Sequence, residues 1–501
     1  MGNVRRWGAL ALLRRRPSRE LSARLPSSLS SSLSAVSPLS TALSLSLALS
    51  ISLSLSGCAD HVQRPEDSIT PPPSWQASTT LEGAQPAWPN ADWWKSFGDP
   101  ALDQLEQSAL AGNFGLQAAA SRVAEAQAIA RIAGAKLYPK LDAKASAERV
   151  SDFSGDVMKQ LHTADLAAVY DPDLAGRLRN LARAKEALVI AAAESQAGVA
   201  LGVSAEVAST YFQLAALGER LELLSRTVDT ARRIDALVET RYRGGAVSEL
   251  DHAQSKTSLA ELEAQFPPLE EARQQTLHAL AILIGRLPAE PVSLPPPLTR
   301  IAPPTAIPVG LPSELLHRRP DILREEAKLA AAHADIRAAR AALFPSLRLT
   351  AEGGYESNEL VTLIRSSSGV VALGADVVAP IFHWGALRAR VERENRRYEA
   401  LLHDYQQTVL DALREVEDAL VAIQKLSEQE RLLDAARRQS QRAFELAEIR
   451  YRGGATDATT MLLAQNTALR LEDSLLQVRL AHLQALVSLY RALGGGATPV
   501  L

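Results

Sequence analysis

The sequence has a single cysteine, Cys58, so the chain can form no disulfide within itself. It lacks any run of about 18 uninterrupted apolar residues, which argues against a conventional transmembrane helix. Aromatic residues make up only 5% of the chain while alanine and leucine are abundant, a composition that favours helix. With 501 residues, 47% of them hydrophobic and 22% charged, the chain is expected to fold and is long enough for more than one domain.

Motifs of catalysis are also missing. The nine histidines, for example His162, His252, His278 and His403, are scattered and form no H-E-x-x-H arrangement. No glycine-rich loop precedes a Lys-Ser/Thr pair, and the carboxylates are spread along helical segments, where solvation or pairing is usual. We therefore expect that the protein is not an enzyme and that it has no cofactor and no metal site.

The first 57 residues differ in composition from the rest. Seven arginines are followed by a serine-rich tract and by the apolar segment TALSLSLALSISLSLSGC, which ends at Cys58. A basic region, an apolar region and small residues in this order predict a secretory signal peptide over residues 1–57. Its removal leaves 47 basic and 56 acidic side chains, a net charge of about −9, which argues against nucleic acid as a partner.

Cys58 directly follows Leu-Ser-Gly, and LSGC resembles a bacterial lipobox, in which the cysteine is acylated and becomes the first mature residue. The alternative is that Cys58 is an unreactive cysteine of the core. We predict a covalent lipid on Cys58, which anchors the N-terminus by burying its CH₂ groups in a bilayer. Because Ala59 and not aspartate follows, the lipobox pattern points to the outer membrane.

The sequence contains a duplication. Ser121–Ala145 aligns without gaps with Ala327–Ala351 at an offset of 206, and RYRGGA occurs at Arg241–Ala246 and again at Arg450–Ala455, an offset of 209. The stretch from Pro288 to Pro312 holds nine prolines and is expected to be an extended connector. The predicted organisation is an N-terminal segment, a first repeat, the connector, a second repeat and a tail, over residues 58–97, 98–287, 288–312, 313–494 and 495–501.

Each half shows the same order of periodicities. A helical segment is followed by strict alternation, in which Leu141 and Ala143 alternate with Asp142 and Lys144. Such alternation predicts a strand with one apolar and one wet face, and polar turn residues separate two strands per half. The expected strands cover residues 139–150, 161–171, 345–356 and 369–380.

Two long segments without proline follow the strands, Asp173–Phe266 and Ile381–Thr498. Their apolar residues recur at three- and four-residue spacing, and a helix of 65 residues would be about 98 Å long, so these helices must pair as coiled coils. Paired glycines end a helix, and the arginines of RYRGGA complement the helix dipole in its last turn. We expect helical hairpins over residues 173–285 and 386–493, each turning at RYRGGA.

Two isolated β-hairpins are marginal alone and leave exposed strand edges. A soluble sheet is the commoner fate of alternating strands, but no other strand-rich segment is present to complete one. A barrel formed by strands from several subunits would have no exposed edges. Strands of about 10 residues also match the length of a tilted membrane-spanning strand.

The order of elements resembles the TolC-like outer membrane factors, and the lipobox fits their lipoprotein branch of the OprM/NodT type. Further matches are WWKSFGDPALDQLEQSALAGN, RRPDILREEAKLAAAHADIRAARAALFPSL and LDHAQSKT, and the resemblance covers nearly all of residues 92–493. It implies a mostly α protein with a small β part, a homotrimer whose 12-stranded outer membrane β-barrel continues into a periplasmic α-helical barrel. It also implies passive export of drugs or small toxic molecules, driven by an inner-membrane pump of the resistance-nodulation-division (RND) type through a periplasmic adaptor.

By resemblance, the helical tips meet the adaptor and form the gate. The residues concerned are Arg241, Tyr242, Arg243, Gly244 and Gly245 in the first copy and Arg450, Tyr451, Arg452, Gly453 and Gly454 in the second. The alternative is that each tip is only a connector.

One departure from the family concerns the pore. Many members carry acidic residues six and nine positions after the last glycine of the second tip, where this chain has Thr460 and Leu463. An acidic constriction is therefore in doubt, and Asp251, Asp457 and Thr460 are only candidates, since either aspartate can equally belong to a solvated helix face. Two rival functions stay open: an exit duct for type I protein secretion, and a periplasmic coiled-coil lipoprotein or adaptor without a pore.

Overall fold

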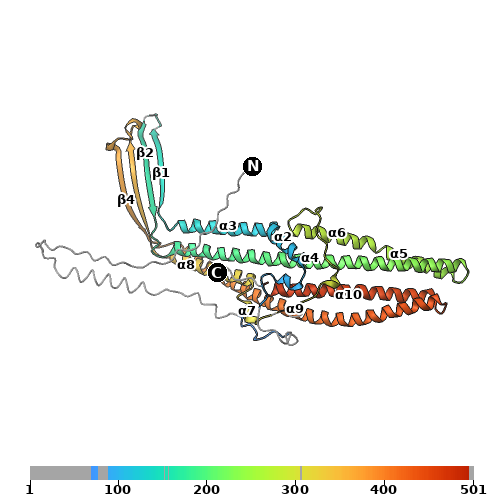
Figure 1. The fold of residues 1–501 in the computed structure, drawn as a ribbon. Helices are drawn as coiled ribbons and strands as arrows, with labels where there is room; N and C mark the ends of the chain where they lie inside the picture. Colours follow the sequence, from blue (N-terminus) through green and yellow to red (C-terminus); the bar gives the residue numbers. More distant parts are fainter. Residues whose placement is uncertain are drawn as a thin grey trace, which may run out of the picture. The chain divides into compact units, whose positions relative to one another are not determined.

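The computed structural model describes residues 69–76, 88–151, 153–155, 157–304, 307 and 309–495 (Figure 1). The predicted signal peptide, Cys58 and the end of the tail lie outside these residues. The elements of the first repeat are the 3₁₀ helix η2 (Trp93–Phe97), α2 (Pro100–Gly112), α3 (Phe114–Ala135), β1 (Lys140–Ser151), β2 (Val157–Tyr170), α4 (Arg177–Arg243), α5 (Glu249–Glu263) and α6 (Phe266–Leu283).

The second repeat follows the same plan after the proline-rich connector, which holds the short helices η3 (Leu298–Arg300) and α7 (Pro312–Leu315). Its elements are α8 (Pro320–Ala341), β3 (Ser346–Ser357), the 3₁₀ turns η4 (Leu360–Thr362) and η5 (Ser366–Ser368), β4 (Gly369–Val378), α9 (Ala386–Arg452) and α10 (Ala458–Ala492). The expectation of a mostly α fold with a small β part is confirmed.

Some helix and strand boundaries differ from the expected ones because of prolines or a β-bulge. The return of the first hairpin is divided into α5 and α6, because Pro267 and Pro268 have no N–H to donate and fit only the first turn of a new helix. Strand β2 begins at Val157, four residues before the expected start, because it follows its partner around a bulge at Val150/Ser151. Strand β4 ends at Val378, two residues before Pro380.

The strands of both repeats form one antiparallel sheet in the order β1-β2-β3-β4. The register aligns the alternation of all four strands, since Leu141 lies opposite Ala168, Ala168 opposite Ala351, and Ala351 opposite Leu373. One face is therefore apolar over its central part, with Leu141, Ala143, Ala145, Ala147, Ala164, Leu166, Ala168, Tyr170, Leu347, Leu349, Ala351, Gly353, Val371, Leu373, Ala375 and Val377. The opposite face carries the charged and hydroxyl side chains of Asp142, Lys144, Ser146, Glu148, Thr163, Asp165, Arg348, Thr350, Glu352, Glu356 and Asp376, together with Ala167, Val169, Val370, Ala372 and Val378.

The apolar face is uncovered in the single chain. Leu373 is 82% exposed and Val371 80% exposed, although both are among the most hydrophobic residue types. An exposed apolar area of this kind marks a surface that another phase or another protein covers.

The long helices pack against one another rather than standing alone. Helix α4 contacts α3, α5, α6, α8 and α10, and α9 contacts α8 and α10. By length and composition α4 is the one helix of the described residues with a segment able to cross a membrane. At roughly 100 Å, however, α4 is more than three times as long as a bilayer core is thick.

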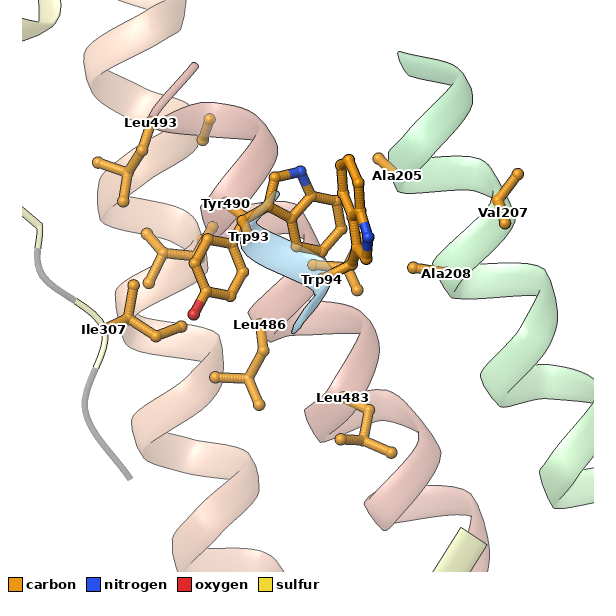
Figure 2. Close-up of a cluster of buried hydrophobic side chains, with 14 of the residues drawn as sticks. Trp93, Trp94, Ala205, Val207, Ala208, Ile307, Leu483, Leu486, Tyr490 and Leu493 are labelled. Carbon is orange, nitrogen blue, oxygen red and sulfur yellow. The ribbon is translucent and has the colours of Figure 1, made fainter. Parts of the chain in front are cut away.

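The main core lies where α2, α4, α9, α10 and the connector meet. Figure 2 shows Trp93 and Trp94 filling the space between α4 and α10. Trp93 stacks on Tyr490 with ring centroids 5.0 Å apart, and Tyr211 donates a hydrogen bond of 2.6 Å to Asp99, which also caps α2. These contacts fix the N-terminal WWKSFGDP segment against both helical hairpins.

A buried arginine connects three helices of the second repeat. Arg319 donates to Glu415 of α9 at 2.9 Å and to the carbonyl oxygen of Ala492, the last residue of α10, at 3.0 Å. It also forms an ion pair of 2.6 Å with Asp321 at the start of α8. One guanidinium thereby joins the start of α8, the middle of α9 and the end of α10, an arrangement that suits the planar five-donor group.

One buried carboxyl makes stability depend on pH. Glu106 of α2 is fully buried among apolar residues, and burial raises its pKa from the usual 4.5 to about 8, against the opposing effect of the Ser204 hydroxyl. Between these values the unfolded chain binds fewer protons than the folded protein, so stability falls as pH rises through this window. We predict that Glu106→Gln removes this component, so that the variant gains thermal stability relative to the wild type from pH 5 to pH 8.

The measurement is the unfolding temperature in detergent at a series of pH values, with the exposed Glu125→Gln of α3 as the matched control. A difference between Glu106→Gln and wild type that stays constant over this range would contradict the prediction.

Candidate functional site

The two RYRGGA copies form the turns of two helical hairpins with the same backbone geometry. Gly244 and Gly453 continue the right-handed helical conformation, with φ of −79° and −81°. Gly245 and Gly454 take positive φ values of 72° and 75°. Only the second glycine of each pair therefore needs the freedom that glycine gives.

Each turn satisfies the carbonyls at the helix end in the same way. The amide of Ala246 donates to the carbonyl of Arg241 at 2.8 Å, and that of Gly245 to the carbonyl of Tyr242 at 2.9 Å. Ala455 and Gly454 repeat both bonds in the second copy, at 2.8 and 3.0 Å. This is the Schellman pattern of helix C-termini, which sets the exit direction of the chain.

The glycine pairs allow a stability test within each tip. Alanine at position 245 would have to adopt positive φ, which costs about 1–2 kcal/mol, while its Cβ would meet nothing within 4 Å. We predict that Gly245→Ala lowers the free energy of unfolding by about this amount, measured by denaturant titration in detergent. Gly244→Ala is the control and is expected to be neutral or slightly stabilising, because its φ is helical. Equal effects of both changes would contradict the assignment.

Arg241 connects the two tips of the chain. Its guanidinium donates to the carbonyl oxygens of Tyr451 and Arg452, both at 2.9 Å, and lies 4.6 Å from the centre of the Tyr451 ring. These carbonyls belong to the last turn of α9, where the helix dipole attracts a cation. The sequence placed Arg241 at the end of its own helix α4; the structure shows that its side chain acts on α9.

The two tip tyrosines have different surroundings. Tyr451 is 1% exposed and packs in an apolar cluster formed by α4, α9 and α10, with the buried members Ile234, Val238, Tyr451, Ala458, Met461 and Leu462. Burial raises the pKa of Tyr451. Tyr242 is 37% exposed and stacks on His252 of α5, with ring centroids 4.8 Å apart.

A charged cluster holds the first tip together. Glu239 of α4 pairs with Arg243 at 2.7 Å and with Lys256 of α5 at 3.7 Å, and it contacts His252. The hydrogen bond from Arg243, with the nearby cations, keeps the pKa of Glu239 below its usual value. The sequence assigned no role at the tip to Glu239 or His252, because neither lies inside RYRGGA.

The candidate constriction residues act as helix caps. Asp251 forms a capping box with Ser248 at the start of α5, and Asp457 is the N-cap of α10, where it accepts from the Thr460 amide at 2.7 Å. This backbone hydrogen bond lowers the pKa of Asp457. Leu463, three residues further on, is exposed. Both aspartates therefore have a local structural role, whatever else they do.

Aromatic residues flank the strands on the side that leads to the helices. Tyr138 precedes β1, Phe344 precedes β3, and Phe382 and Trp384 follow β4. All four are exposed, and the Phe382 and Trp384 rings lie 4.8 Å apart. Exposed aromatic residues at the ends of an apolar band are typical of a membrane–water interface.

Among the residues that the structure describes, no group of three or more His, Cys, Asp or Glu side chains is placed to hold a metal ion.

Comparison with known proteins agrees with this arrangement. The family model described as outer membrane efflux protein matches residues 105–286 and 311–495. The pyoverdine export outer membrane protein OpmQ of Pseudomonas aeruginosa is 38% identical over 454 residues, covering 88% of this chain and 94% of OpmQ. The toluene efflux pump outer membrane protein TtgI of Pseudomonas putida is 34% identical over 412 residues, covering 80% of this chain and 86% of TtgI.

Solved structures show the same fold. The outer-membrane channel OprN superposes with a TM-score of 0.81 at 29% identity, covering 88% of this chain and 99% of OprN. The outer membrane channel MtrE of Neisseria gonorrhoeae, in its open state, gives a TM-score of 0.79 at 29% identity, covering 88% of this chain and 98% of MtrE.

Fold, surfaces and comparisons together define a transport protein of the outer membrane. The chain belongs to the outer membrane efflux protein family. The resemblance drawn from the sequence, the fold class and the outer membrane location are thereby confirmed.

Proposed function

We propose that the protein is a homotrimeric exit duct of a tripartite efflux system. The observation that carries this proposal is the four-stranded sheet, which has a continuous apolar face and two edge strands, β1 and β4, each paired on one side only within the chain. Three copies, each contributing four strands, close such a sheet into a 12-stranded barrel without edges. The apolar face then meets lipid, and the charged face lines the channel.

The helices continue this channel into the periplasm. Strands β2 and β4 lead directly into the 67-residue helices α4 and α9, whose far ends are the RYRGGA tips. In this proposal the tips form the gate and meet a periplasmic adaptor, and an inner-membrane pump of the RND type supplies the energy. A lipid on Cys58 adds a membrane anchor to the barrel.

Small molecules are the proposed cargo. OpmQ is named for pyoverdine export and TtgI for toluene efflux, both of which are small-molecule cargoes. Export of drugs or small toxic compounds fits these names better than type I protein secretion.

The deciding experiment combines oligomer mass with channel activity. Purified mature protein in detergent is expected to have three times the chain mass, and in planar bilayers to give small, fluctuating currents because the tips are closed at rest. A monomer or dimer without current would contradict the barrel and favour the pore-free coiled-coil lipoprotein.

Asp457 tests whether charge at the second tip controls the current. Since its carboxylate caps α10, we predict that Asp457→Ala changes single-channel conductance modestly at most, and that Asp457→Asn, which keeps a capping oxygen, matches the wild type. A several-fold rise in conductance or a loss of cation preference in Asp457→Asn would show that this charge constricts the pore.

A further inference from the structure

The second repeat contains an equivalent of Arg241, but among the described residues this equivalent makes no contact like that of Arg241 with Tyr451. The offset of 209 between the repeats relates Arg241 to Arg450, Tyr242 to Tyr451 and His252 to Met461. Arg241 lies over the Tyr451 ring and binds the end of α9. Arg450 is exposed, and within the described residues its side chain makes no hydrogen bond or ion pair.

The environment of Tyr242 differs from that of Tyr451 in the residue packed against its ring and, among the described residues, in having no arginine over the ring. Tyr451 has Arg241 over its ring and packs in one cluster with Met461. Tyr242 has His252, the counterpart of Met461, stacked on its ring, and remains 37% exposed. The missing partner is an arginine in the position that Arg241 takes on Tyr451.

The end of α4 also offers the same hydrogen-bond acceptors as the end of α9. The carbonyl of Tyr242 accepts one amide bond from Gly245, as that of Tyr451 does from Gly454. A carbonyl oxygen accepts two hydrogen bonds, and Arg241 supplies the second one at Tyr451. Among the described residues no side chain occupies the second acceptor position of the Tyr242 carbonyl or donates to the carbonyl of Arg243, so both can accept from a donor outside the chain.

We propose that Arg450 binds the tip of α4 in a second copy of this chain, with its guanidinium over the partner's Tyr242 and donating to the carbonyls of the partner's Tyr242 and the partner's Arg243. The inference rests on the proposed trimer. A ring of three two-repeat chains contains six tips, and each tip of one repeat lies between two tips of the other. Three junctions then lie within chains, made by Arg241, and three lie between chains, made by Arg450.

This assignment gives the two arginines different roles. Arg241 holds together the two hairpins of one chain, whereas Arg450 joins neighbouring chains and is broken when the tips move apart. The contact between chains is the weaker of the two, because Tyr242 is partly exposed and packs on a polar histidine, whereas Tyr451 lies in an apolar cluster.

The test is photo-crosslinking in the full-length, purified protein. The photoreactive residue p-benzoyl-phenylalanine replaces Arg450 in one variant and Arg241 in the matched control. After irradiation, the variant at position 450 is expected to give covalent dimers and trimers on a denaturing gel, with the crosslink mapped by mass spectrometry to the peptide that contains Tyr242. The control at position 241 is expected to crosslink to the Tyr451 peptide without an increase in chain mass.

Mixed trimers of isotopically light and heavy chains identify crosslinks between chains. Heavy–light crosslinked peptides joining position 450 to the Tyr242 peptide would support the proposal. A native trimer in which position 450 crosslinks only within its own chain, or not to the Tyr242 peptide, would overturn it and leave this surface for the adaptor. A protein that is monomeric before irradiation would overturn the proposed trimer itself, and this inference with it.

Discussion

The structure depends on the unpaired edges of one small sheet. Within the described chain β1 and β4 each pair on one side only, and the shared alternation of all four strands gathers the apolar side chains on one face. An open edge is a template for pairing with another strand, and a large apolar face marks a surface that binds lipid or protein. The closed membrane barrel that we propose meets both requirements at once, and it gives a reason for four strands in a chain dominated by helices.

Duplication supplies two copies of each element, but the copies are not used identically. The first hairpin returns through α5 and α6, broken at Pro267, whereas the second returns through the unbroken α10. Tyr451 is buried and Tyr242 is not. Repeats that start from one sequence thus diverge according to what packs against them.

Much of the local structure followed from the sequence. Alternation at Leu141–Lys144 predicted a two-faced strand, and the proline-free segments with three- and four-residue spacing predicted long paired helices, because these periods are imposed by backbone geometry. The glycine pairs predicted the turns. The sequence did not reveal that Arg241 acts on α9 instead of on its own helix, since that contact joins residues 210 positions apart.

What the sequence by itself determined is therefore the set of elements, the face each strand presents and the place where each hairpin turns, all of which are local properties of spacing and backbone conformation. Only the tertiary structure decided that β2 pairs with β3 and merges the repeats into one sheet, and that Arg319 joins α8, α9 and α10. These features depend on contacts between residues that are far apart in the sequence, and local periodicity does not show which of them come together.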